Sequence, residues 1–276
     1  MILFPNAKIN LGLNIVAKRK DGYHDIVSCL YPIGWQDVLE VLENKKKTEL
    51  KITGLDIPGP GGAGKEKDNL VLRAYELLRK DYNLPAVTVH LHKIIPTGAG
   101  LGGGSADAAF MLRAVNEMYQ LFLDDFILED YASRLGSDCP FFIQNKPVIV
   151  RERGDVFEDV QLDLKEYWLV VVKPPVHVST AEAYAGVSPA SPEHNLKEIL
   201  EQKPVEEWKN LLHNSFEDSL FPRFPQIKEL KERLYTAGAL YASMSGSGSA
   251  VYGIFRQPVP AFSLEADYQF WQGPMR

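Results

Sequence analysis

The sequence predicts an α+β fold in two domains, on three grounds. The chain has 276 residues, and at roughly 150 residues per domain this length corresponds to two domains. Short alternating segments, typical of antiparallel strands, are interspersed with groups of amphipathic helices rather than with one helix after each strand. The composition is 45% hydrophobic and 24% charged, which supplies a full core. We expect the domains to span residues 1–155 and 156–276.

The first half of the chain contains both kinds of element. Apolar and polar residues alternate over residues 8–16, which predicts a strand whose polar face carries Lys8, Asn10 and Gly12. The same pattern predicts further strands near residues 26–31, 37–43, 48–53 and 86–93. Helical periodicity predicts helices over residues 68–80, 105–119 and 125–135.

The second half begins with an apolar strand at residues 167–173, which two prolines end. Short helices are expected at residues 180–186, 193–202 and 225–237. Two short strands, at residues 240–244 and 250–255, flank a loop of serine and glycine.

Charge and composition exclude several classes of protein. Lys and Arg number 30 against 36 Asp and Glu, a net charge of -6, so a broad electrostatic surface for nucleic acid or anionic lipid is not expected. No run of 18 apolar residues and no signal peptide are seen. The two cysteines, Cys29 and Cys139, form no zinc or disulfide pattern. We therefore expect a cytoplasmic protein that binds neither nucleic acid nor a membrane and needs no obligate protein partner.

Three glycine-rich segments are candidates for holding a phosphate. Residues 59–66 fit GxxxxGK, but Glu66 stands where a P-loop needs a hydroxyl group for Mg²⁺, so we interpret this match as fortuitous. Residues 243–250 lie between two short apolar strands, and their small side chains would let the segment fold over a ligand or against another loop. A plain hairpin turn fits this segment about equally well.

The central segment, residues 96–106, is the strongest candidate. It follows a predicted strand and enters a predicted helix, with five glycines in seven positions. Glycines let backbone N–H groups approach an anion, and the helix N-terminus adds unpaired donors. Ser105 is placed either to cap the helix or to bind Mg²⁺. The segment also satisfies GxGxxG, but no second parallel strand ending in an acidic residue follows, as a dinucleotide fold requires.

Taken together, three segments resemble the motifs of the GHMP kinase superfamily in the right order. They are residues 6–11, 96–106 and 245–248. Asp21-Gly22-Tyr23-His24 and residues 136–142 further resemble the family of 4-diphosphocytidyl-2-C-methyl-D-erythritol kinases. Asn6, where proline is common, and Ala106, where a second serine is frequent, depart from the pattern.

The resemblance implies an enzyme that uses ATP and Mg²⁺ to phosphorylate a hydroxyl group of a cytidine diphosphate compound, in the non-mevalonate isoprenoid pathway. It implies an N-terminal ATP-binding domain with a mixed sheet and helices, and a C-terminal substrate domain resembling an α/β sandwich. The residues implied to hold ATP are Pro96, Thr97, Gly98, Ala99, Gly100, Leu101, Gly102, Gly103, Gly104, Ser105 and Ala106.

The resemblance also assigns catalytic roles. Asp138 is implied to accept the proton of the attacking hydroxyl group, Lys8 to stabilise developing charge, and Ser105 to bind Mg²⁺. Read from the sequence alone, Asp138 equally fits a helix N-cap and Lys8 a solvated lysine.

Four further residues are implied to bind the substrate. Tyr23 and Tyr184 would stack on the cytosine, His24 would read its edge, and Asn10 shares the polar strand face with Lys8. For Tyr184, a half-buried helix tyrosine is the alternative.

Three other functions remain open at this stage. The chain fits another GHMP kinase, acting on mevalonate-type compounds, homoserine or a sugar, although such substrates need no pair of stacking tyrosines. A dinucleotide-binding oxidoreductase and a catalytically inactive nucleotide-binding regulator fit less well.

Overall fold

The computed structural model describes residues 1–55, 68–259 and 264–276, so the GxxxxGK match at residues 59–66 lies outside the described residues. The chain forms two compact units. Unit 1 comprises residues 1–7, 35–97 and 102–146, and unit 2 comprises residues 8–34, 98–101 and 147–276. The predicted division of function at residue 155 stays a prediction.

Unit 1 contains a mixed sheet in the strand order β1-β4-β6-β5. The strands are β1 (Ile2–Leu3), β4 (Val38–Glu43), β5 (Glu49–Gly54) and β6 (Val87–Lys93). β5 runs parallel to β6, whereas β1–β4 and β4–β6 are antiparallel. Alternate residues of β6 are buried, and Lys93 is the last residue in that buried register.

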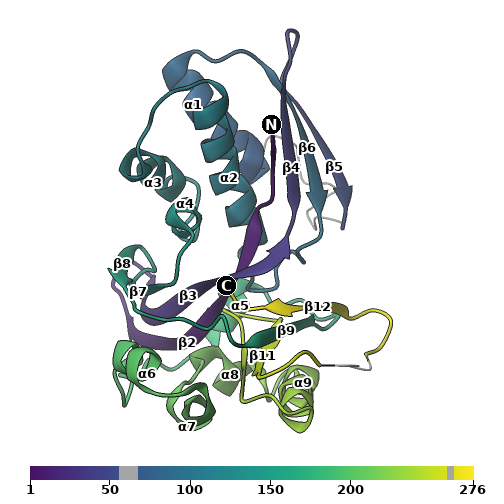
Figure 1. The fold of residues 1–276 in the computed structure, drawn as a ribbon. Coiled ribbons are helices and arrows are strands. Elements are labelled where there is room, and N and C mark those ends of the chain that lie inside the picture. Colours follow the sequence, from purple (N-terminus) through teal and green to yellow (C-terminus); the bar gives the residue numbers. More distant parts are fainter. Residues whose placement is uncertain (56–67, 260–263) are drawn as a thin grey trace. The chain divides into compact units, whose positions relative to one another are not determined.

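The described residues of unit 1 also form four helices, of which α1 and α2 lie beside the sheet (Figure 1). The helices are α1 (Leu70–Tyr82), α2 (Gly103–Met118), α3 (Asp125–Ser133) and α4 (Phe141–Gln144). α1 begins at Leu70 because the Asn69 side chain accepts a hydrogen bond from the Val71 N–H group. α2 packs against α1, α3 and α4.

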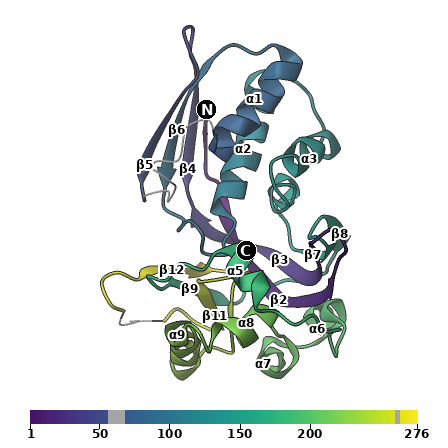
Figure 2. The same ribbon diagram turned by 180° about the vertical axis from the view of Figure 1, so that it is seen from behind.

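Unit 2 contains two four-stranded sheets (Figure 2). The first has the order β2-β3-β7-β8, with β2 (Asn6–Lys18), β3 (His24–Gln36), β7 (Val148–Glu152) and β8 (Val156–Asp159). The second has the order β10-β11-β9-β12, with β9 (Trp168–Lys173), β10 (Tyr241–Met244), β11 (Val251–Phe255) and β12 (Gln269–Pro274), all antiparallel. The first residues of β2 and the last of β3 belong to unit 1.

Short helices pack around these sheets. They are α5 (Thr180–Ala185), α6 (Leu196–Gln202), α7 (Trp208–Leu211), α8 (Ser215–Leu220) and α9 (Pro225–Thr236), with a 3-10 turn at Val205–Glu207. α9 packs on β10 and β11. One apolar core joins residues of β2, β9, β11, α8 and α9, including Ile15, Val170 and Leu230. Burial of each such side chain contributes about 1.5–3 kcal/mol.

The α+β prediction is confirmed, and the predicted elements are found with shifted ends. Sequence reasoning missed the strands β1, β7, β8 and β12 and the short helices α7 and α8. Across the residues that the structure describes, no helix combines the length and apolarity needed to cross a bilayer.

Candidate active site

Lys8 and Asn10 lie next to each other on the polar face of β2 and are both buried, each with 4% exposure. The Lys8 Nζ atom donates to Asn10 Oδ1 at 2.6 Å, and the Asn10 amide donates to Ser28 Oγ at 2.8 Å. The interpretation of Lys8 as a solvated edge lysine is therefore wrong. Lysine side chains are rarely buried to this extent, so Lys8 is a candidate functional residue.

The glycine-rich loop (residues 96–106) is held on its unit 2 side by two other segments. The Lys8 N–H group donates to the Leu101 carbonyl at 2.9 Å. The serine–glycine loop (residues 245–248) contributes the Ser245 hydroxyl group, which donates to the Gly100 carbonyl at 2.8 Å. Within unit 2, all three sequence motifs therefore meet. The serine–glycine loop folds against another loop and is not a plain hairpin turn.

Gly100 must be glycine for two reasons. Its φ is +76°, a left-handed conformation that side chains disfavour. A Cβ atom there would also lie 1.9 Å from the Ser245 carbonyl oxygen. Gly246 approaches the same place, since a Cβ atom on it would lie 3.3 Å from both Asn10 Oδ1 and the Gly100 carbonyl oxygen.

Side chains at the start of helix α8 hold the serine–glycine loop and the strand before it in place through hydrogen bonds. The Asn214 amide donates to the carbonyl groups of Met244 (2.8 Å) and Gly246 (3.0 Å), while its oxygen caps α8. Glu217, 5% exposed, accepts from the Ser243 hydroxyl group and the Met244 N–H group. Sequence reasoning did not identify Asn214 or Glu217, because each acts through backbone groups about 30 residues away.

In unit 1, α2 begins with backbone donors that lack a side-chain cap. Its N-cap is Gly102, φ +71°, and no described side chain caps the helix there. Ser105 is the third helical residue, so the interpretation of Ser105 as the helix cap is wrong. Uncapped N–H groups and an exposed Gly104 leave this helix end able to hold an anion.

Asp138 lies in the turn between α3 and α4 and is half-buried. The N-cap of α4 is Pro140, so the interpretation of Asp138 as a cap is wrong. Burial raises the pKa of the thiol group of the next residue, Cys139, to about 11. A hydrogen bond with Ser105 lowers this pKa, and the charge of Asp138 raises it. In unit 1 the Asp138 turn therefore adjoins the first turn of α2. Lys8 belongs to unit 2, and its predicted action together with Asp138 stays a prediction.

The predicted cytosine-binding residues lie in unit 2. The rings of His24 and Tyr184 stack, with centroids 4.9 Å apart and planes at 26°, and Tyr184 meets Phe216 edge to face. Tyr23 is 60% exposed, with the Arg153 guanidinium group 5.5 Å from its ring centroid. Burial, and secondly the charge of Lys18, lower the pKa of His24 below 6.5, so its ring is neutral at neutral pH.

A buried ion cluster that sequence reasoning missed lies in unit 1, at the end of β6 and beside the start of α2. Lys93 contacts the carboxylates of Asp37 and Asp107, and all three are nearly unexposed. Burial raises the pKa of Asp107 to about 7, although the Lys93 ammonium group opposes this. Burial also opposes the ammonium form of Lys93, but the two carboxylates outweigh it and raise the pKa of Lys93.

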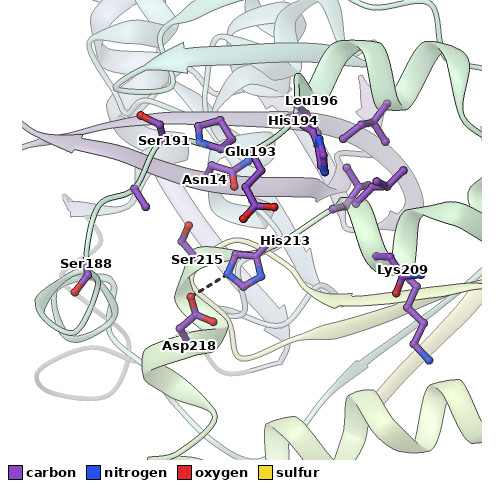
Figure 3. A pocket seen from close by; sticks show the side chains of 16 residues that line it. Asn14, Ser188, Ser191, Glu193, His194, Leu196, Lys209, His213, Ser215 and Asp218 are labelled. Carbon is purple, nitrogen blue, oxygen red and sulfur yellow. Dashed lines mark hydrogen bonds and ion pairs between the residues drawn. The ribbon is translucent and has the colours of Figure 1, made fainter.

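A pocket of about 420 Å³ opens elsewhere in unit 2, between β2 and the segments around α6 to α8 (Figure 3). His213 pairs with Asp218 at 3.0 Å on one wall, and Glu193, His194 and Lys209 also line it. It contains none of the predicted site residues, and its mixture of acidic and basic groups selects no class of ligand.

Comparisons with known proteins identify the family. The family described as GHMP kinases N terminal domain matches residues 69–146, and GHMP kinases C terminal matches residues 196–269. A 4-diphosphocytidyl-2-C-methyl-D-erythritol kinase of Bacteroides fragilis is 50% identical over 275 residues, covering 98% of each chain. The chain belongs to the 4-diphosphocytidyl-2-C-methyl-D-erythritol kinase family of the GHMP kinases. A second such kinase, from Parabacteroides distasonis, is 50% identical and covers 100% of each chain.

Solved structures agree with this kinase family. A crystal structure of a 4-(cytidine 5'-diphospho)-2C-methyl-D-erythritol kinase matches with a TM-score of 0.77 and 33% identity, covering 92% of this chain and 89% of that one. The mevalonate kinase of Methanococcus jannaschii shares the fold, with a TM-score of 0.69 and 15% identity, covering 92% of this chain and 90% of that one. Membership of this kinase family sets aside the dinucleotide-binding oxidoreductase.

Proposed function

We propose that this kinase transfers the γ-phosphoryl group of ATP to a hydroxyl group of 4-diphosphocytidyl-2-C-methyl-D-erythritol, in the non-mevalonate isoprenoid pathway. GHMP kinases use ATP. The observation that carries the proposal is the meeting, within unit 2, of the Lys8–Asn10 strand face, the glycine-rich loop and the serine–glycine loop. The full-length similarity to kinases named for this substrate supports it.

The glycine-rich loop fits the phosphates of ATP. Phosphate binding needs N–H groups that no side chain shields, and the loop has positive φ at Gly98, Gly100 and Gly102 and an uncapped helix start. In this proposal the residues from Pro96 to Ala106 hold ATP. Residues 1–155 then carry most of the ATP site and residues 156–276 complete the substrate site.

Asp138 and Lys8 carry the catalysis in this proposal. The Asp138 carboxylate accepts the proton of the attacking hydroxyl group, which suits a loose transition state in which little covalent help is needed. The Lys8 ammonium group, whose burial strengthens its field, stabilises the developing negative charge. Asn10 holds that ammonium group in place through the 2.6 Å hydrogen bond.

The hydroxyl group of Ser105 is an oxygen donor of the kind that Mg²⁺ prefers, and it stands at the first turn of α2. We assign it as a Mg²⁺ ligand. When bound, Mg²⁺ neutralises phosphate charge. The protein itself orients the phosphates through backbone N–H groups.

Recognition of the cytidine part rests on aromatic side chains. Tyr23 is exposed enough to stack on a base, and Tyr184 presents a ring already engaged in stacking with His24. A neutral His24 offers one donor and one acceptor nitrogen to the base edge. Cys29 and Cys139 are both free thiols, in keeping with the cytoplasmic location that we propose.

The experiment is ADP release, coupled to a reporter enzyme, with three acceptors at equal concentration. We expect turnover with 4-diphosphocytidyl-2-C-methyl-D-erythritol and at least about a hundredfold lower kcat/KM with mevalonate and homoserine, because neither can use the aromatic residues. Equal or higher kcat/KM with mevalonate or homoserine would overturn the substrate assignment. No ADP release with any acceptor would point to the inactive regulator.

A further inference from the structure

One buried cluster in unit 1 has no part in the chemistry proposed above, yet it touches both ends of the glycine-rich loop. Its members are Lys93, Asp37 and Asp107, with exposures of 3%, 0% and 2%. The Lys93 Nζ atom lies 2.6 Å from Asp107 Oδ2 and also contacts Asp37 Oδ2.

The cluster holds the start of the loop through Asp37. Its second carboxylate oxygen, Oδ1, accepts hydrogen bonds from the N–H groups of Ile94 (2.5 Å) and Ile95 (2.8 Å). These are the two residues that follow β6. Asp37 is itself fixed, because its N–H group donates to the Pro5 carbonyl at 2.8 Å.

The cluster holds the end of the loop through α2. Asp107 lies just after the first turn of that helix, and its carboxylate reaches back to the ammonium group at the end of β6. Gly103, the first helical residue, packs directly on the cluster. A Cβ atom there would lie 2.8 Å from Ile95 Cγ2 and 3.4 Å from Lys93 Nζ.

Stability does not explain such a cluster. Removing charges from water costs several kcal/mol for each ion, and apolar replacements of similar volume are often as stable or more stable. The arrangement also leaves Asp107 Oδ1 buried without a hydrogen-bond partner among the described residues. What the cluster supplies is geometry: one ammonium group fixes the distance between the strand end and the helix start.

We propose that Lys93, Asp37 and Asp107 are positioning residues that fix the phosphate-binding conformation of the glycine-rich loop. The proposal rests on the proposed function, since it takes this loop to bind ATP. By anchoring residues 94–95 and the start of α2, the cluster orders the intervening N–H groups before the nucleotide arrives. The cluster therefore affects the affinity for ATP and leaves the binding of the cytidine substrate unchanged.

The test compares two variants with wild type. In the first, Lys93→Met and Asp107→Leu are combined, which removes the ammonium group that joins the strand end to the helix start. Among the described residues, the Asp37 carboxylate then keeps only its hydrogen bonds from the N–H groups of Ile94 and Ile95. In the second, Asp107→Asn keeps an acceptor for Lys93. The control is Tyr131→Phe, which deletes a 2.6 Å hydrogen bond to Asp81 within unit 1 but away from the loop.

Three quantities are measured: ATP affinity by calorimetry with Mg²⁺ present, KM for the cytidine substrate, and amide hydrogen exchange of residues 97–104. The double variant is expected to bind ATP about tenfold more weakly and to exchange faster in the loop, with substrate KM within about twofold of wild type. The Asp107→Asn variant is expected to have an ATP affinity and a loop exchange rate between those of the double variant and wild type. The Tyr131→Phe variant is expected to match wild type in all three quantities.

Two results would overturn the proposal: a folded double variant with wild-type ATP affinity and loop exchange, or equal weakening of both substrates. If the double variant does not fold, Asp107→Asn decides on the same criteria. Wild type that binds ATP but phosphorylates nothing would refute the proposed function alone. Wild type that does not bind ATP would refute both.

Discussion

Asp138 is the residue on which the proposed chemistry depends most. It lies in a turn that adjoins the first turn of α2, and it does not cap a helix. Lys8, the other residue of the proposed chemistry, is buried, where lysines are rarely found.

Replacement of Asp138 by Asn is expected to lower kcat by at least about a hundredfold, because an amide cannot accept the proton. ATP affinity is expected to stay within about threefold of wild type. Steady-state kinetics and calorimetry measure the two quantities. Asp130→Asn, an exposed carboxylate on α3, is the matched control and should leave both unchanged. Near-normal turnover of Asp138→Asn would refute the assignment of the base.

His24 predicts a pH dependence at the same scale. Its pKa lies below 6.5, mainly because of burial, so protonation removes the acceptor nitrogen only below that pH. KM for the cytidine substrate should therefore be constant above pH 6.5 and rise as the pH falls through the lowered pKa. The measurement is KM from about pH 5 to about pH 8 in wild type and His24→Gln. The same acid rise in His24→Gln would assign the titration to another group.

At the scale of elements, the glycine-rich loop is shaped by its contacts with the serine–glycine loop. Gly100→Ala would both strain a φ of +76° and drive a Cβ atom to 1.9 Å from the Ser245 carbonyl oxygen. ATP affinity is expected to fall by about tenfold or more. Gly238→Ala is the control, because φ there is +98° but nothing lies within 4 Å.

Only the backbone cost of about 1–2 kcal/mol applies to that control, so urea unfolding should show a small loss and ATP affinity no change. If the two variants lost ATP affinity equally, the contact with the serine–glycine loop would not shape the ATP site.

The elements differ in how well the sequence predicted them. α1 and α2 have long apolar stripes, so their periodicity alone locates them, although α2 begins at Gly103, two residues before the predicted start. β12 contains Gly273 and Pro274 and lacks alternation, and it becomes a strand by pairing with β9. Asp107 was missed because its partner Lys93 is 14 residues away, and only the fold brings them together. The available signal was a lysine in the buried register of β6.

For the whole molecule, the motifs and the α+β class could be read from the sequence, whereas the division into units could not. The glycine-rich loop is continuous in the chain, yet residues 98–101 belong to unit 2 and residues 102–106 to unit 1. Composition and periodicity cannot predict that one loop is divided between two units. The division depends on contacts between distant segments, such as the hydrogen bond between Ser245 and Gly100.

The most direct measurement is ³¹P nuclear magnetic resonance of the product formed from ATP and 4-diphosphocytidyl-2-C-methyl-D-erythritol. We predict one new phosphomonoester signal, an intact diphosphate bridge, and one equivalent of ADP for each phosphomonoester. Hydrolysis of ATP to free phosphate without a new ester, or cleavage of the diphosphate bridge, would contradict the account.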